Sequence, residues 1–114
     1  MEDSTLADLK AKHGRVVVIT LRSDIEFAIR APNKGEYRAF RAKVHNPMQA
    51  PDATEDLLRA IVVWCNGEGG DDAIAARKAL NALLDQYPGI SENKAVSETI
   101  ADMTGMSVGE QGKL

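Results

Sequence analysis

The side chains that most often carry catalysis are few in this chain and stand apart from one another. The two histidines, His13 and His45, fall at helix ends and have no cysteine or second histidine at metal-site spacing. The single cysteine, Cys65, lies among apolar residues, which predicts a buried and unreactive thiol. The adjacent acids Asp71 and Asp72 precede a helical pattern, where such pairs normally cap the helix. We therefore expect no enzyme, no catalytic residue, no metal site and no cofactor.

Binding chemistry is concentrated in one segment, where an apolar row and a basic row run along the same expected helix. The apolar row is Tyr37, Phe40 and Val44, and the basic row, about 100° further around the axis, is Lys34, Arg38 and Arg41. Two interpretations stay open. Either the aromatic row packs into the core beside a solvated basic flank, or both rows contact a partner.

Length and composition indicate one ordinary domain with an aliphatic core. The 114 residues suffice for a single core, and 44% hydrophobic with 27% charged residues argue against global disorder. The acidic start, MEDSTLADLK, is unlike a secretory signal, and no apolar run approaches the length of about 18 residues that a bilayer span requires. We expect a cytoplasmic protein without a membrane segment.

The charge is divided along the chain. Residues 1–45 carry nine Lys and Arg against six Asp and Glu, whereas residues 46–114 carry five against eleven. Such a division can place a basic patch against an acidic partner, or let copies associate head to tail as a homo-oligomer. Nucleic acid is a weak candidate, because the basic segment 30–43 is short and no strand interleaves basic with aromatic residues.

The elements that must position these residues begin with a short helix and a β-hairpin. Asp3 or Ser4 is expected to cap the helix, and Gly14 to end it. The β-branched run 16–21 and the alternating run 25–30 predict two antiparallel strands joined by a tight turn.

The segment that carries the two rows is expected to be the helix 34–45. Asn33 is a good N-cap, and Glu36 falls three residues later in an approximate capping box. Because an isolated hairpin is marginal in water, we expect this helix to cover the apolar face of the two strands.

The rest of the chain predicts helices. The pattern indicates a mobile irregular segment at 46–52, followed by a core helix over 54–65 with Trp64 at the edge of its apolar face. A flexible turn is expected at Gly67–Gly70. Two further helices follow: one is capped by Asp71 and ends before Pro88, and the last covers 96–103 and is stopped by Gly105. The predicted fold is α+β, an N-terminal antiparallel β-hairpin packed against a bundle of about four helices. Residues 1–105 would form a single domain, and residues 106–114 a flexible tail.

The ordered pattern resembles the small tail assembly chaperones of long-tailed bacteriophages and related prophages. The segments that carry the resemblance are VVVITLRSDIEFAIRAP, NKGEYRAFRAK, EDLLRAIVVWC and LLDQYPGISENKAVSETIADMTG, which lie within residues 16–105. In that family a hairpin leads into a helical body that ends with a Pro-Gly turn, a lysine and an apolar helix closed by glycine. The matching residues here are Pro88, Gly89, Lys94, Ile100 and Gly105.

The resemblance implies a non-structural helper in the cytoplasm of the bacterial host, which binds the tape-measure protein and keeps it soluble while tail-tube protein is recruited. Surface chemistry, rather than a family motif, then indicates the partner-binding residues: Tyr37, Phe40 and Trp64 as apolar contacts, with Arg38 and Arg41 as a polar rim. The alternatives are a self-associating structural or adaptor protein of a phage tail, and a small regulatory protein that binds nucleic acid or another protein.

Overall fold

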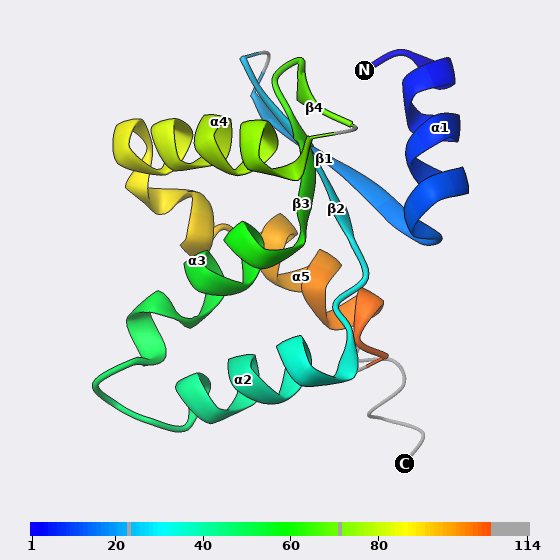
Figure 1. The fold of residues 1–114 in the computed structure, drawn as a ribbon. Coiled ribbons are helices and arrows are strands. Elements are labelled where there is room, and N and C mark those ends of the chain that lie inside the picture. The colour runs from blue at the N-terminus through cyan, green and yellow to red at the C-terminus, as the bar shows by residue number, and fades with distance from the viewer. Residues whose placement is uncertain (23, 71, 106–114) are drawn as a thin grey trace.

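A four-stranded antiparallel sheet with helices on both faces forms the frame of the molecule (Figure 1). The computed structural model describes residues 1–22, 24–70 and 72–105. In chain order the elements are α1 (Asp3–His13), β1 (Val16–Arg22), β2 (Ile25–Arg30), α2 (Lys34–Val44), α3 (Ala50–Ile61), β3 (Val62–Cys65), β4 (Glu68–Gly69), α4 (Ala73–Gln86), the 3-10 helix η1 (Pro88–Glu92) and α5 (Lys94–Met103). The predicted α+β class is confirmed; the predicted tail, 106–114, lies outside the described residues.

The strands lie in the order β1-β2-β3-β4, and each neighbouring pair is antiparallel. The predicted hairpin of β1 and β2 is present, with Val18 opposite Ala28. A second hairpin joins β3 to β4 through Asn66 and Gly67, whose φ angles of 47° and 93° are those of a type I′ turn. The sheet is therefore made of two hairpins side by side.

The sheet separates two apolar clusters. The larger cluster fills the space between the sheet and the helices α3, α4 and α5, and its fully buried members include Phe27, Ile29, Leu58, Ile61, Leu80 and Val96. The smaller one lies on the other face, beneath α1, and consists of Leu9, Val16, Ala28 and Val63 with partly buried neighbours that include Trp64. In Figure 1, α1 accordingly stands alone on one side of the strands.

The predicted helix over 54–65 is wrong at its C-terminal end. The helix α3 ends at Ile61, and Val62–Cys65 form β3, which pairs with β2. The apolar spacing of Leu57, Leu58 and Ile61 is helical, but the β-branched residues that follow suit an extended strand between two neighbours. Pairing with β2 therefore overrides the helical continuation.

The prediction that the helix 34–45 covers the hairpin is also wrong. The helix exists as α2, but its main packing partner is α3, and Figure 1 shows it beyond the end of the sheet. The sheet is instead covered by α3, α4 and α5 on one face and α1 on the other, so that the described part contains five α-helices rather than about four.

Smaller corrections concern element boundaries. The irregular segment predicted at 46–52 is shorter, because α3 begins at Ala50 with Pro51 in its first turn, a position that tolerates proline. The N-cap of α4 is Asp72, whose side chain accepts hydrogen bonds from Ile74 N and Ala75 N; Asp71 lies outside the described residues. Glu2, rather than Asp3 or Ser4, occupies the N-cap position of α1, and makes no side-chain cap.

Two helix ends agree with prediction. Gly14, at φ 82°, ends α1, and α4 ends at Gln86 before Pro88. Val96, Ile100 and Met103 form the buried face of α5, as their spacing indicates.

Among the described residues, no helix is both long enough and apolar enough to cross a membrane.

Candidate protein-binding groove

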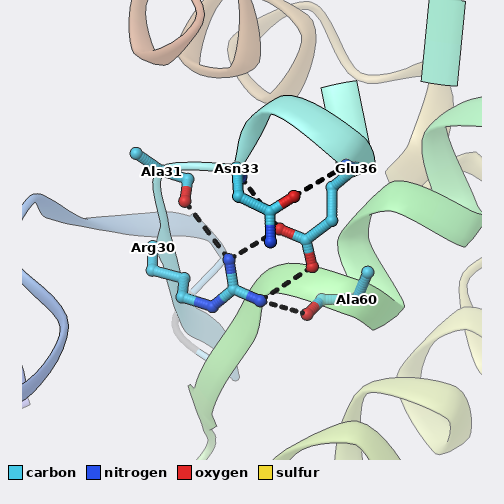
Figure 2. A network of polar contacts seen from close by, with 5 residues as sticks. All are labelled: Arg30, Ala31, Asn33, Glu36 and Ala60. Atoms are coloured by element: carbon cyan, nitrogen blue, oxygen red, sulfur yellow. Dashed lines mark hydrogen bonds and ion pairs between the residues drawn. The ribbon is translucent and has the colours of Figure 1, made fainter. Parts of the chain in front are cut away.

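A network around the Glu36 carboxylate fixes the start of α2 (Figure 2). The Asn33 side chain accepts a hydrogen bond from Glu36 N at 2.8 Å, and Glu36 Oε1 accepts one from Asn33 N at 3.0 Å, so that the predicted capping box is confirmed. Arg30, at the end of β2, donates from its two terminal nitrogens to the two Glu36 oxygens, each at 2.8 Å. The same guanidinium donates to the Ala60 carbonyl oxygen of α3 at 3.1 Å. One cation thus joins β2, α2 and α3.

This contact shifts the pKa values of both partners. The hydrogen bonds from Arg30 are the main cause that lowers the pKa of Glu36, and those to Glu36 raise the pKa of Arg30. Both shifts favour the charged forms, and the bidentate geometry is the arrangement in which an arginine and a carboxylate interact most strongly.

The helix α2 is attached to the body without burying any of its side chains fully. At its far end, Lys43 Nζ lies 2.9 Å from Asp56 Oδ2 of α3. Between the two ion pairs, Phe40 is partly buried and packs against the larger cluster. A partly open cavity of about 120 Å³ lies beside Phe40 and is lined by residues of both α2 and α3. The packing of α2 is therefore looser than that of the other helices, each of which buries at least one side chain.

An open groove of about 240 Å³ runs between α2 and α5. Its walls are mainly apolar or small, and its lining residues are Tyr37, Phe40, Arg41 and Val44 of α2, Thr54 of α3, and Ser97, Ile100, Ala101 and Thr104 at and after α5. Val44 is 43% exposed and Met48, in the loop after α2, is 87% exposed, which makes them two of the three large apolar side chains that the described residues leave open to solvent.

Three of the five predicted contact residues meet in this groove. Tyr37 and Phe40 line it, and Arg41 lies at its edge, where its Nη1 donates to the Tyr37 hydroxyl oxygen at 3.4 Å. The apolar row is not sealed in the core: Tyr37 and Phe40 are half-buried and Val44 is exposed, and Phe40 both packs against the core and borders the groove. Arg38 is exposed on the same helix and does not line the groove.

Trp64 is separated from the other predicted contacts. It lies in β3 opposite Ala28 and packs with the cluster beneath α1, on the other face of the sheet. Its predicted position at the edge of a helix face followed from the wrong assignment of Val62–Cys65. A binding surface that combines Trp64 with Tyr37 and Phe40 is therefore not formed by this fold.

Sequence reasoning missed the opposite wall of the groove. Ile100, which lies on the last helix that the sequence predicts, is 4% exposed and also forms part of the groove. Ser97, Ala101 and Thr104 repeat at i, i+4 and i+7 beside it, a row of small residues that leaves room for a neighbouring helix. That spacing was the available signal, but only the tertiary structure places the row opposite α2.

Two of the groups considered for catalysis, Cys65 and His13, are enclosed by the fold. Cys65 is fully buried, and burial raises its pKa to about 11, in agreement with the expected unreactive thiol. His13 Nε2 is buried with no hydrogen-bond partner among the described residues, and burial, followed by the nearby charges of Lys12 and Arg30, lowers the pKa of His13. No cluster of three or more potential metal ligands occurs within the described ranges.

Comparison with known proteins identifies a shared fold. No known protein family matches the chain, and no curated protein matches it. An uncharacterised protein from Bacillus stearothermophilus has a similar structure, with a TM-score of 0.68 and 19% sequence identity; the match covers 90% of this chain and 94% of that protein. At this level of identity the likeness concerns the fold alone.

Proposed function

We propose that this protein is a tail assembly chaperone of a long-tailed bacteriophage or prophage, which binds the tape-measure protein in the host cytoplasm and keeps it soluble while tail-tube protein assembles around it. The observation that carries the proposal is the groove between α2 and α5, where the aromatic row borders open space instead of a sealed core. The order of segments that resembles the chaperone family supplies the identity of the client.

In the proposed binding mode, a helix of the client lies in the groove between α2 and α5. A long helical client exposes apolar stripes before assembly, and such stripes associate with one another unless they are covered. Tyr37, Phe40 and Val44 span two turns of α2, so they offer apolar contacts to a client helix at i, i+3 or i+4 and i+7. The exposed thioether of Met48 extends this surface with a flexible side chain suited to varied partners.

Co-expression with the longest helical protein encoded beside this chain tests the proposal. We expect the client to become soluble and to co-purify with this protein. Tyr37→Ala/Phe40→Ala should abolish co-purification, and Val44→Asp should do so with less effect on folding, because Val44 is 43% exposed. Ile74→Ala is the matched control, since Ile74 is 73% exposed on α4, away from the groove.

The folding of each variant is checked by circular dichroism and thermal unfolding, because Phe40 also contacts the core. An insoluble client together with self-assembly of this chain would contradict the proposal and favour a structural tail component. Solubilisation that all three groove substitutions leave unchanged would show that a different surface binds the client.

A further inference from the structure

The two walls of the groove differ in charge. On α2, Lys34 and Arg41 fall within about 60° of Tyr37 around the helix axis, whereas Arg38 is about 100° away. We call Lys34 and Arg41 the basic border: Arg41 lines the groove, and Lys34 lies on the same side of α2, one turn before Tyr37 and outside the lining residues. Arg38 is further around the helix axis and does not line the groove. The lining residues of the opposite wall include no charged side chain: they are Thr54, Ser97, Ile100, Ala101 and Thr104.

The two cations of the border are not neutralised within the described part of the chain. Of the other charges of α2, Glu36 pairs with Arg30 and Lys43 pairs with Asp56, whereas Arg38 is exposed on the side away from the groove lining. Arg41, by contrast, contacts only the neutral Tyr37 hydroxyl and the His45 ring, and Lys34 is exposed at the first turn. One positive charge, on Arg41, thus lies at the side of an apolar groove, and a second, on Lys34, lies beyond the Tyr37 end of the same wall.

We propose that the occupant of this groove is an amphipathic helix with acidic residues along one flank and small, uncharged residues along the other. The inference rests on the proposed function, because it defines the chemistry of the client segment. Lys34 and Arg41 are seven residues apart, a rise of about 10 Å, which matches carboxylates two turns apart on a client helix. The row of Ser97, Ala101 and Thr104 accepts the small flank at close range.

Nucleic acid fits this surface less well than an acidic helix. Phosphate contacts need several cations on the approach surface, and here Arg41 is the one cation among the described lining residues, beside apolar side chains that include Phe40 and Ile100. An apolar helix face fills such a space, and its acidic flank then meets the basic border.

The test uses the full chain and three synthetic helices with one identical leucine face. One flank carries glutamate, glutamine or lysine in the three versions, and the other flank carries alanine. Calorimetric titration should show the glutamate peptide binding more tightly than the lysine peptide by about tenfold or more, with a difference that shrinks as salt is raised. Lys34→Glu/Arg41→Glu should invert this preference.

Matched variants distinguish an effect of the basic border from an effect of the protein's net charge. Lys10→Glu/Lys78→Glu makes the same change in net charge on exposed positions of α1 and α4, and should leave the preference for the glutamate peptide unchanged. Arg38→Glu should have a smaller effect than Arg41→Glu. Circular dichroism confirms that each variant is folded.

Three outcomes would overturn the inference. Equal binding of the three peptides, lost in Phe40→Ala, would mean that the groove accepts helices regardless of charge, and would leave the chaperone proposal intact. Absence of peptide binding while the client still co-purifies would place the client elsewhere on the protein. Displacement of the glutamate peptide by a short DNA duplex, dependent on Lys34 and Arg41, would identify nucleic acid as the partner.

Discussion

The Glu36 carboxylate accepts hydrogen bonds from both terminal nitrogens of Arg30, and it also accepts one from Asn33 N that completes the capping box of α2. One carboxylate therefore determines where α2 begins and how it is attached to β2. Because α2 forms a wall of the groove, the same carboxylate helps to hold that wall in place.

Glu36→Gln should lower the free energy of unfolding by about 1 to 2 kcal/mol, because it removes the charge from a partly exposed ion pair and weakens the cap. Urea unfolding at neutral pH measures the loss. Lys94→Gln is a control, since Lys94 belongs to an exposed pair with Glu98 at 3.8 Å and should change stability little. Equal losses in the two variants would contradict the role given to Glu36.

The stability difference between the wild type and Glu36→Gln should depend on pH. Hydrogen bonds from Arg30 lower the pKa of Glu36 below its ordinary value of 4.5, so the native state holds the charged form more strongly than the unfolded chain does. The advantage is present in full above pH 4.5 and disappears as pH falls through the lowered pKa of the native state. A difference that persisted in strong acid would contradict this linkage.

Asn66 should be a sensitive residue in the turn of the second hairpin. Its φ is 47°, its side-chain oxygen accepts from Glu26 N at 2.9 Å, and its amide donates to the Asp24 carbonyl oxygen at 2.9 Å. Asn66→Ala should cost about 2 kcal/mol of stability in thermal unfolding, since it loses both bonds and strains the turn. Asn66→Asp keeps the acceptor and should cost less; the reverse order would show that the bonds to the first hairpin are unimportant.

Gly69 should not tolerate a side chain. A Cβ there would lie 2.6 Å from the Val63 carbonyl oxygen and 2.8 Å from Ala76 Cβ, and φ is 117°. Gly69→Ala should therefore destabilise the protein by more than about 2 kcal/mol in urea unfolding. Gly67→Ala is the control for backbone strain alone, because φ is 93° there and no atom lies within 4 Å of the added carbon. Similar losses in both variants would exclude the contact with Ala76 as a cause.

The Cys65 thiol should be protected from labelling reagents in the native state. It is fully buried, and its pKa of about 11 leaves little thiolate at neutral pH. Because β3 is paired on both sides, we expect labelling to require global opening and to follow the unfolding free energy across the variants above. Rapid labelling of the folded wild type would contradict this prediction.

Local signals in the sequence were sufficient for α2 and for the first hairpin. Asn33 and Glu36 form the capping box that their spacing predicts, and Ile25, Phe27 and Ile29 of β2 are buried as their alternation indicates. Ala28, on the other face of β2, is buried as well, because the cluster beneath α1 covers that face. These elements are defined by contacts within a few residues, so a reading of neighbouring residues can find them. The position of α2 against α3 depends on Arg30 and Ala60, which are 30 residues apart, and could not be found in this way.

The strand β3 was missed although a signal was present. Asn-Gly at residues 66–67 is the strongest short hairpin pattern, and it follows the β-branched pair Val62–Val63. The helical spacing of the apolar residues up to Ile61 favoured a continued helix. Pairing with β2, which is distant in the sequence, has no effect on the spacing of neighbouring apolar residues and so could not correct this prediction. The same error moved Trp64 to the wrong face and joined it to a site that it does not reach.

Because the sheet separates the two apolar clusters, the fluorescence of Trp64 can serve as a probe of one cluster alone. Trp64 is the chain's one tryptophan, and it reports only on the cluster beneath α1. Its emission should follow detachment of α1 and remain constant when a helix enters the groove between α2 and α5. A red shift during a client titration would therefore indicate a disturbance of the α1 face, whatever the affinity of the groove.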